Sequence, residues 1–321
     1  MPLTNTRDLF AKALRGKYAI GAFNMYNLEL LQAIVEACEE EQAPVILQMS
    51  SGARKYAHPV YLSALVEAAA SLASIPIAVH LDHGDSFETC KHCIDEGFTS
   101  VMIDASHETF EKNIETCRRV VDYAHQHNCV VEGELGMLVG AQHDDGEEGG
   151  AYSRGGCYTH PGQAVDFVKQ SGVDSLAVAI GNSHGAYKFK GEQHLDLERL
   201  KAIKQALQDA GLGDYPLVLH GASSVPKDLA REVNAHGGLL GEETAGVPEA
   251  DIEVARRIGC AKVNIDTDLR LAMTGAVRKA LAESPKEFDP RKYLAPGRAK
   301  VKELVRHKVR NVLCCAGQAL N

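Results

Sequence analysis

The chain has 321 residues, a formal net charge of −9, 45% hydrophobic residues and 24% charged residues. This composition is typical of a soluble globular protein and excludes the fibrous, disordered and disulfide-dense classes. Lys and Arg are scattered along an acidic chain, so nucleic acid is not an expected partner. With neither a leader segment nor an apolar run of about 18 residues, we expect a cytoplasmic protein that binds no membrane. The nine cysteines are expected to stay reduced there.

Eight short apolar segments recur along the chain, and each is followed by a stretch with helical periodicity. The expected strands are 19–24, 45–50, 77–83, 100–106, 130–136, 175–181, 217–223 and 261–267. The expected helices include 28–41, 110–127, 195–210 and 269–283, and 296–321 has the pattern of a helix with a tail. The alternation predicts a (β/α)8 TIM barrel that forms a single domain over residues 1–321, with a C-terminal helical extension. An open, doubly wound sheet is the alternative, but no Gly-rich dinucleotide loop follows the first strand.

Polar residues with catalytic potential stand where the expected strands end. They are Asn24, Ser50, Asp82, His83, Asp104, His107, Glu134, His184, His220, Ser223, Asn264 and Asp266. The active sites of TIM barrels lie at the carboxyl ends of the strands, so these side chains are expected to converge. Any one of them alone would be explained as a turn or cap residue. So many ionisable groups in one place are hard to explain without a metal.

Three histidines from separate strands fit a catalytic zinc site. Such sites take three protein ligands, often imidazoles, and leave a position open for substrate or water. His83, His184 and His220 stand at the ends of the third, sixth and seventh strands. His80 lies within a strand and is expected to have a core or surface role. Cys90 and Cys93 have the spacing of a metal or redox pair, but they lie in an expected helix without a second pair.

Several long motifs make the chain resemble the class II fructose/tagatose-bisphosphate aldolases. They run in order through nearly the whole chain: HLDHGD (80–85), SVMIDAS (100–106), EGELG (132–136), AVAIGNSHGAY (177–187), LHGASS (219–224), VNIDTD (263–268) and FDPRKYL (288–294). The resemblance implies reversible cleavage of fructose 1,6-bisphosphate into dihydroxyacetone phosphate and glyceraldehyde 3-phosphate, a step of glycolysis and gluconeogenesis. It implies a homodimer or higher homo-oligomer, with a phosphorylated sugar as the binding partner.

The resemblance also assigns roles to the metal site and the base. It implies that His83, His184 and His220 hold one catalytic Zn²⁺, which acts as a Lewis acid and stabilises an ene-diolate. Asp104 and Glu134 match positions for a second divalent ion or an alternative zinc position. A monovalent cation is left open.

Asp82 matches the base that takes the proton of the C4 hydroxyl. Substrate-binding positions are also implied, with Gly-rich turns whose backbone N–H groups approach a phosphate. By match to the family they are Ser50, Gly185, Gly221, Ala222, Ser223, Asn264, Asp266 and Thr267. Lys188 adds a positive charge there, unless it is a solvated loop residue. Arg270 matches an Arg that reaches the distal phosphate of a neighbouring subunit, and a helix-surface Arg is the alternative reading.

Two positions bear on which sugar is cleaved and on where the chain departs from the family pattern. Asp266 goes with fructose-type substrates in the family, where the tagatose enzymes tend to carry Ala, so tagatose-1,6-bisphosphate aldolase is the runner-up. Where the family has a catalytic loop Glu, this chain has Gln142, which cannot act as a carboxylate base. The replacement is left open among Asp144, His143, the later glutamates, and His184 with Glu134. The stretch 146–156 reads either as a lid or as an insertion.

Other reaction classes fit the sequence less well. A Schiff-base aldolase needs a desolvated Lys inside the barrel, and Lys262 is expected early in the last strand, toward the wrong face. A zinc hydrolase of the amidohydrolase type lacks its usual His-x-His, because the first strand ends in Asn24. A non-catalytic metal-binding scaffold would not need Asp82 beside His83.

Overall fold

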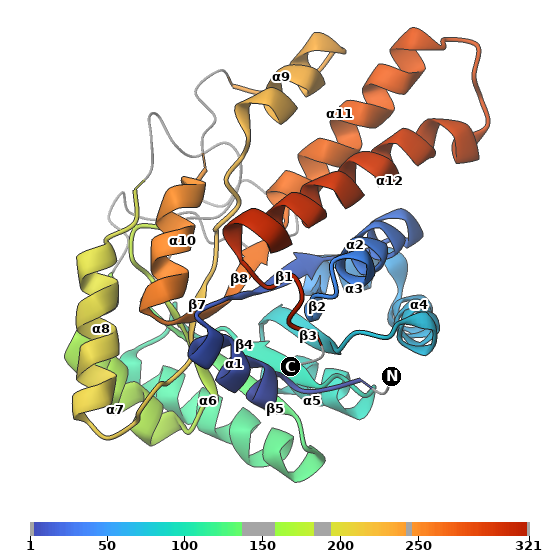
Figure 1. The fold of residues 1–321 in the computed structure, drawn as a ribbon. Helices are drawn as coiled ribbons and strands as arrows, with labels where there is room; N and C mark the ends of the chain where they lie inside the picture. Colours follow the sequence, from blue (N-terminus) through green and yellow to red (C-terminus); the bar gives the residue numbers. More distant parts are fainter. Residues whose placement is uncertain (1–2, 137–157, 183–193, 242–245, 320–321) are drawn as a thin grey trace.

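The core of the protein is a closed barrel of parallel strands (Figure 1). The computed structural model describes residues 3–136, 158–182, 194–241 and 246–319. Each strand pairs with the next along the chain, and β8 closes the ring on β1. The strands are β1 (Ile20–Asn24), β2 (Val45–Ser50), β3 (Ile77–Gly84), β4 (Ser100–Ile103), β5 (Val130–Leu135), β6 (Ser175–Val178), β7 (Leu217–Leu219) and β8 (Cys260–Ile265). The predicted TIM barrel is confirmed.

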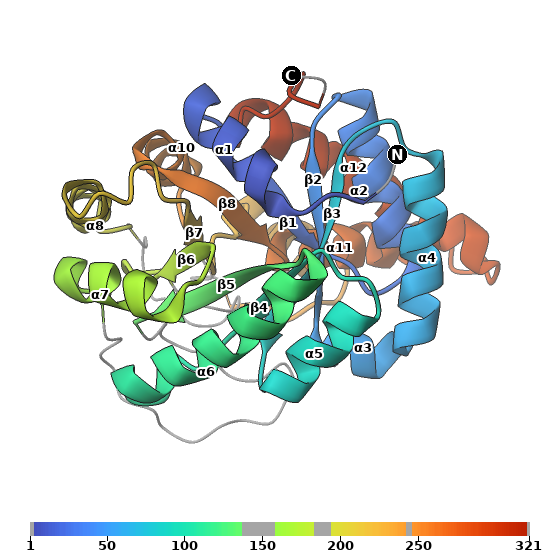
Figure 2. The ribbon, with the colours of Figure 1, turned by 90° about the horizontal axis from the view of Figure 1, so that it is seen from below.

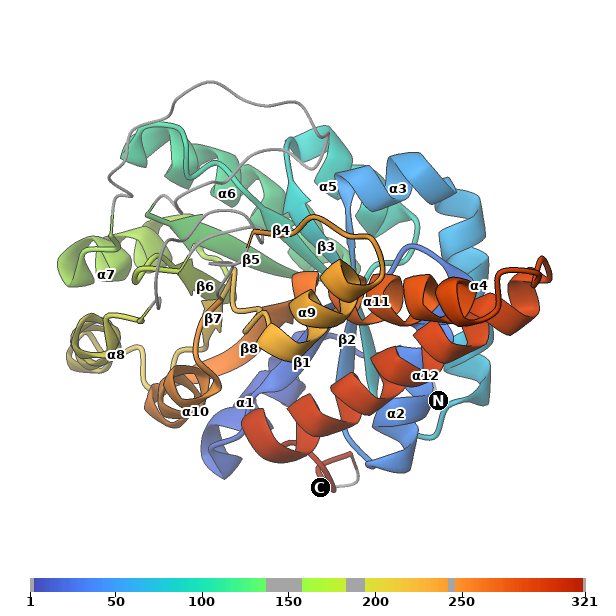
Figure 3. The ribbon, with the colours of Figure 1, turned by 90° about the horizontal axis from the view of Figure 1, so that it is seen from above.

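Helices ring the barrel, as the views from below and above show (Figures 2 and 3). They are α1 (Thr6–Gly16), α2 (Leu28–Glu40), α3 (Ser51–Ala57), α4 (Pro59–Leu72), α5 (Phe87–Asp95), α6 (Phe110–Ala124), α7 (Pro161–Ser171), α8 (Leu197–Asp209), α9 (Lys227–Ala235), α10 (Glu249–Ile258), α11 (Thr267–Glu283) and α12 (Pro290–His307). Short 3₁₀ and π turns, His125–His127 and Lys308–Val312, follow α6 and α12. Among the described helices, none is long and apolar enough to cross a membrane.

Both faces of each strand are covered by other parts of the protein, which favours apolar residues along the strand. One face looks into the barrel and the other packs under the helices, so β2 and β5 are buried along their whole length. Several helices begin where a polar side chain accepts a hydrogen bond from a backbone N–H of the first turn. Asn27, Ser86 and Thr109 cap α2, α5 and α6 in this way.

Three strands end three or four residues earlier than the sequence pattern predicted. β4, β6 and β7 end at Ile103, Val178 and Leu219, and the polar residues after them belong to loops. Side chains replace the strand ladder there: Asn182 accepts from the Ile180 N–H and donates to the His220 carbonyl. The loops therefore keep their buried backbone groups satisfied without a strand partner.

The C-terminal extension is a helical hairpin in which α11 and α12 lie side by side and project from the barrel (Figures 1 and 3). The predicted start of the last helix at residue 296 was wrong, because α12 begins at Pro290 with Asp289 as its N-cap. Pro290 suits a first helical turn, whose N–H groups have no partner within the helix. Pro296 lies inside the helix, where packing of α12 against α11 and α2 outweighs its lost hydrogen bond.

Candidate active site

Asp82 and His83 are consecutive residues of β3, and both face the carboxyl-end mouth of the barrel. In a regular strand they would point to opposite faces. Here the β3–β4 register shifts between Leu81 and Gly84, and His83 has a left-handed φ of 49°. This bulge brings His83 Nε2 to 3.8 Å from Asp82 Oδ1, so the two side chains act in one site.

Two imidazoles meet over the centre of the mouth. His83 Nε2 lies 3.0 Å from His220 Nδ1, and the two rings are nearly perpendicular, at 85°. On its other side, His83 Nδ1 bonds Asp104 Oδ2 at 2.8 Å, just past the end of β4. Glu134, near the end of β5, places Oε2 4.0 Å from His220 Nδ1. The structure thus brings four of the predicted metal-site residues together.

The Asp82 carboxylate is held by side-chain amides from the strands on both sides of the barrel closure. Asn24 Nδ2 donates to Asp82 Oδ2 at 2.9 Å, and Asn264 Nδ2 donates to Oδ1 at 3.1 Å. Gln48 donates to Asn24 Oδ1 at 2.6 Å and thereby orients that amide. Ser50 pairs with Asp82 in the β2–β3 ladder and caps α3. Each Asp82 oxygen is therefore oriented while remaining an acceptor.

The electrostatics of the site favour a cation. Burial alone would lower the pKa of His83, but the carboxylates of Asp82, Asp104 and Glu134 raise it to about 10. Burial and the Asp104 charge raise the pKa of Glu134 well above its usual range. Burial would also raise the pKa of Asp82, yet the imidazoles of His83 and His220 hold it below its usual value. Without a metal, this excess of carboxylates keeps a proton on His83.

The loop after β7 and the start of α11 form a second part of the mouth. Asp266 N–H donates to Ser223 Oγ at 3.3 Å, and Asp268 accepts from the N–H groups of Ser224 and Val225. Gly221, in the same loop, has a left-handed φ of 57°, which glycine adopts without a Cβ penalty. Ala222 is buried in the same loop, and Thr267 opens α11. This places the predicted phosphate-binding residues beside a helix N-terminus.

Arg270 is bound within its own chain. Its guanidinium donates to Asp266 Oδ1 at 3.0 Å and pairs with Oδ2 at 2.7 Å, and it lies over the Tyr26 ring. Almost half of the Arg270 side chain is exposed. The arrangement leaves the guanidinium near the mouth, on the first turn of α11.

Comparisons with known proteins agree with this geometry. The family model "Fructose-bisphosphate aldolase class-II" matches residues 4–318. A fructose-bisphosphate aldolase of Treponema pallidum is 46% identical over 99% of this chain and 98% of its own. One of Thermus caldophilus is 48% identical over 94% and 95% of the two chains. This chain belongs to the class II fructose-bisphosphate aldolase family.

A solved structure supports the assignment at the level of the fold. The YdjI aldolase from Escherichia coli K12 superposes with a TM-score of 0.77 and 30% identity, covering 99% of this chain and 100% of that one. As a class II aldolase, the protein is a carbon–carbon lyase of a family that uses zinc. The resemblance carried by the motifs is confirmed.

The described residues fit a divalent metal ion. Two sets of ligand atoms lie within 4.8 Å of one another: Asp82, His83 and His220, and His83, Asp104 and Glu134. Glu134 Oε2 is buried, and none of the described residues gives it a hydrogen bond, as expected of an oxygen that awaits a cation. Three predicted positions, His184, Gly185 and Lys188, lie outside the described residues, as do Gln142 and the stretch 146–156.

Sequence reasoning missed the layer beneath the mouth. Lys262 was expected early in the last strand, away from the active-site face, and it does lie below the mouth. Its full burial in the interior, where it bonds both oxygens of Glu132, was not expected. Lys262 is held in an ion pair with Glu132 and lies below the mouth, so it is not placed to act as a Schiff-base nucleophile. Glu132 and Lys262 stand two residues before Glu134 and Asn264, and residues i and i+2 of a strand share a face. That spacing was the available signal.

His107, named among the strand-end residues, and the Cys90–Cys93 pair, which was not expected to bind metal, are absent from both described groups of candidate ligands. The His107 side chain is exposed, and its Nε2 lies 3.6 Å from Glu108 Oε1. Cys90 and Cys93 are buried in α5, and burial raises the pKa of Cys93 to about 12, which keeps the thiol protonated. Neither cysteine therefore has the thiolate character that metal binding or redox cycling needs.

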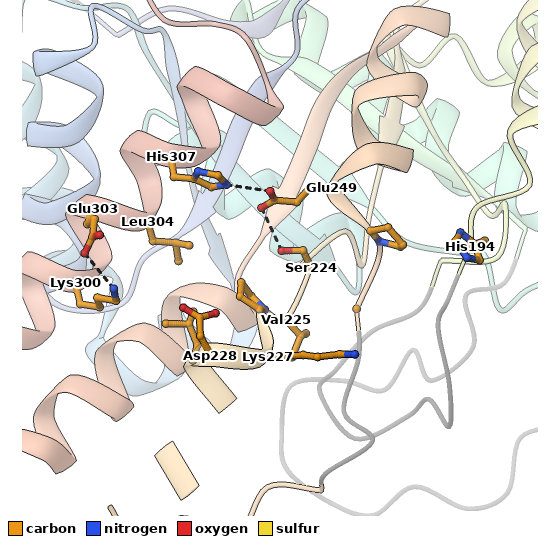
Figure 4. A pocket seen from close by; sticks show the side chains of 14 residues that line it. His194, Ser224, Val225, Lys227, Asp228, Glu249, Lys300, Glu303, Leu304 and His307 are labelled. Carbon is orange, nitrogen blue, oxygen red and sulfur yellow. Dashed lines mark hydrogen bonds and ion pairs between the residues drawn. The ribbon is translucent and has the colours of Figure 1, made fainter. Parts of the chain in front are cut away.

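A separate cavity of about 590 Å³ lies between the loop after β7, the start of α10 and α12 (Figure 4). Two close pairs line it: His307 with Glu249 at 2.9 Å, and Lys300 with Glu303 at 3.1 Å. Among the described residues that line it, none is a candidate metal ligand. It is therefore distinct from the mouth where His83 and His220 meet.

Proposed function

We propose that the protein catalyses the reversible aldol cleavage of fructose 1,6-bisphosphate to dihydroxyacetone phosphate and glyceraldehyde 3-phosphate. One observation carries this proposal. The imidazoles of His83 and His220 face each other at 3.0 Å beside an oriented Asp82 carboxylate, in a chain of the class II aldolase family. A metal centre that stabilises the developing negative charge, with an adjacent base for the hydroxyl proton, can carry out the cleavage of a β-hydroxy carbonyl compound.

His83, His220 and the family-matched His184 would hold one catalytic zinc ion. Nitrogen ligands, a tetrahedral preference and an open fourth position suit such a site. When bound, the zinc supplies a Lewis acid that polarises the C2 carbonyl of the open-chain sugar. Asp104 and Glu134, which share His83 with the first set, are the residues for a second divalent ion or a second position of the first.

Asp82 is the proposed base for the C4 hydroxyl. Its lowered pKa keeps it ionised at neutral pH, and Asn24 and Asn264 hold its two oxygens in place. When Asp82 takes the hydroxyl proton, the C3–C4 bond breaks and C4 becomes the aldehyde carbon of glyceraldehyde 3-phosphate. The electron pair of that bond stays on the dihydroxyacetone-phosphate half, whose C3 is then protonated. In the reverse reaction Asp82 returns its proton.

The phosphate groups are proposed to bind at the mouth. The loop 221–223 and the α11 N-terminus at Asp266 and Thr267 offer backbone N–H groups to the phosphate of the dihydroxyacetone half. Arg270 is proposed to bind the distal phosphate from a neighbouring subunit, which requires a homodimer or larger homo-oligomer. Ser50, Gly185 and Lys188 complete the proposed substrate contacts. We place the enzyme in the cytoplasm and in glycolysis, as a single domain over 1–321.

A direct assay tests the proposal. Purified protein is given fructose or tagatose 1,6-bisphosphate, and triose phosphate release is followed by coupled NADH oxidation, before and after treatment with a chelator. We expect faster cleavage of the fructose substrate, loss of activity with the chelator and recovery with added zinc. Activity that survives the chelator but is trapped by borohydride would contradict the metal mechanism. Faster cleavage of tagatose 1,6-bisphosphate would favour the runner-up substrate.

A further inference from the structure

A chain of buried polar groups lies directly behind His220. The Nε2 atom of His220 lies 2.6 Å from Glu132 Oε1, and Lys262 Nζ donates to Glu132 Oε1 and Oε2 at 3.0 and 2.9 Å. Lys262 also bonds His80 Nε2 at 3.1 Å, and His80 Nδ1 bonds Ser100 Oγ at 2.7 Å. The chain therefore joins β7, β5, β8, β3 and β4 across the interior of the barrel.

The burial of these groups makes stability a poor explanation for their presence. Glu132 is 1% exposed, and Lys262 and His80 are 0% exposed. Removing two charges from water is costly, and a packed apolar set of similar volume is often at least as stable. The residue that the ion pair can orient is His220, whose Nε2 atom bonds Glu132 Oε1.

The geometry determines which nitrogen of His220 faces the mouth. A carboxylate only accepts hydrogen bonds, so the short contact to Glu132 places the proton on Nε2 of His220. A neutral ring then carries its lone pair on Nδ1, the atom that lies 3.0 Å from His83 Nε2. Metal-bound histidines commonly donate their second N–H to a carboxylate in this way, which orients the ring and raises its basicity.

Lys262 in turn holds Glu132. Its two bonds to the carboxylate oxygens fix the plane of that group, and its charge compensates a carboxylate that has no contact with water. His80 accepts from Lys262 through Nε2, so the ammonium is itself oriented. Without Lys262, Glu132 would lose two of its hydrogen bonds and keep the one from His220, so its carboxylate plane would no longer be fixed.

We propose that Glu132, held by Lys262, is a positioning residue that fixes His220 in the tautomer whose Nδ1 lone pair faces the mouth, and thereby sets the zinc affinity of the site. This inference rests on the proposed function, because it takes His220 as a zinc ligand. Neither Glu132 nor Lys262 touches substrate. Both act through the orientation and basicity of one imidazole.

Two variants test the inference with readouts other than turnover. Glu132→Gln keeps the shape of the side chain and removes its charge. Lys262→Met removes the ammonium group and its two hydrogen bonds to Glu132. Zinc affinity is measured by competition with a chromogenic chelator, and the absorption spectrum of the Co²⁺-substituted protein reports the ligand geometry. We expect zinc binding to weaken by ~10- to 100-fold in Glu132→Gln, with a changed cobalt spectrum. Lys262→Met should change both in the same direction.

Lys204→Met is the matched control. Lys204 is also a buried lysine, 6% exposed, but it donates to the Tyr215 carbonyl just before β7, away from His220. Thermal unfolding of the zinc-free proteins shows whether each variant folds. We expect the control to lose stability while its zinc affinity and cobalt spectrum stay as in the wild type. If Glu132→Gln does not fold, Lys262→Met decides the question.

The outcomes separate this inference from the proposed function. If the wild type binds zinc and cleaves the sugar bisphosphate while both variants bind zinc within twofold of it and keep its cobalt spectrum, the positioning role is wrong and the proposed function stands. Equal weakening of zinc binding in Lys204→Met would also overturn the inference, since it would reveal a general effect of instability. A wild type that binds no zinc would overturn both.

Discussion

His83 Nε2 and His220 Nδ1 lie 3.0 Å apart although 137 positions separate the residues in the sequence. Their strands, β3 and β7, stand opposite each other in the closed order of the barrel. The two rings therefore meet over the barrel axis rather than at its wall. With His83 protonated, its Nε2–H points at the Nδ1 lone pair of His220, and a metal ion can take the place of that shared proton.

Replacement of the base should affect turnover more than metal binding. In Asp82→Ala we expect kcat to fall by ~10²- to 10⁴-fold, the usual contribution of one acid–base group, while zinc still binds at the histidines. Steady-state kinetics and zinc analysis of the same preparation measure the two effects. Asp85→Ala, an exposed aspartate three residues further on, is the control and should keep its activity. A near wild-type rate in Asp82→Ala would refute the role of this carboxylate.

Arg270→Ala should weaken binding of the bisphosphate. A hydrogen bond to a charged group contributes about 1.5–3 kcal/mol, so we expect KM to rise roughly 10- to 100-fold. Arg278→Ala, on the same helix and bonded only to the His236 carbonyl among the described contacts, is the control and should leave KM unchanged. An unchanged KM in Arg270→Ala would assign Arg270 to the helix surface.

Mixing two impaired variants, assayed at a substrate concentration well below the KM of Arg270→Ala, tests whether Arg270 acts across subunits. If it does, hybrids of Arg270→Ala and Asp82→Ala contain one site with both wild-type residues. We expect part of the activity to return after the two are unfolded together and refolded as a mixture. Absence of recovery, with hybrids detected by native mass spectrometry, would place Arg270 in the site of its own subunit.

Asp266→Ala should reduce the preference for fructose over tagatose 1,6-bisphosphate. The Asp266 side chain holds the Arg270 guanidinium, so its loss loosens that cation. If Asp266 also contacts the substrate near C4, as its family match implies, the variant loses that contact as well. The ratio of kcat/KM for the two sugars measures the effect. Asp268→Asn would not be a suitable control, because Asp268 holds the loop at Ser224. A ratio equal to that of the wild type would show that selectivity lies elsewhere.

Stability at acid pH should depend on the ion pair between the buried Lys308 Nζ and Glu249 Oε1, which lie 2.8 Å apart. Burial would raise the pKa of Glu249, but the Lys308 charge and hydrogen bond lower it below 4.5. A lowered folded pKa adds stability above the unfolded value of 4.5, and that stability is lost as pH falls from there through the folded pKa. We therefore expect the stability advantage of wild type over Lys308→Met to shrink as the pH falls from about 5 to below 4, through the unfolded and then the lowered folded pKa of Glu249. Urea unfolding of the zinc-free proteins measures it, and an advantage that stays constant or grows would contradict this account.

The barrel was predictable because its strands are buried on both faces. Runs such as VILQMS in β2 stand out by their apolar character, and each run is followed by a helix pattern. The ends of the strands were less predictable. Polar residues that continue the chain past Val178 or Leu219 lie in loops stabilised by side chains such as Asn182, and no periodicity reports those bonds.

The site was predictable in its residue types and less so in its geometry. Family motifs pointed to Asp82 and His83, but two consecutive strand residues meet in one site only because of the bulge and the left-handed φ of His83. Glu132 and Lys262 escaped notice because a buried ion pair has no periodic signature of its own. Each stands two residues before a site residue, Glu134 or Asn264, and therefore shares its inward face. This spacing places the pair one layer below the site, but only once the interior is known to be filled in layers.

The central claim is that His83 and His220 share one metal ion at the mouth of the barrel. Diffraction from crystals of the zinc-loaded protein, measured at the zinc absorption edge, locates the metal directly. We predict one strong anomalous peak about 2.0–2.1 Å from both His83 Nε2 and His220 Nδ1, with the His184 imidazole as a third ligand. A peak beyond coordination distance of either His83 or His220, or bound elsewhere in a catalytically active preparation, would contradict the account.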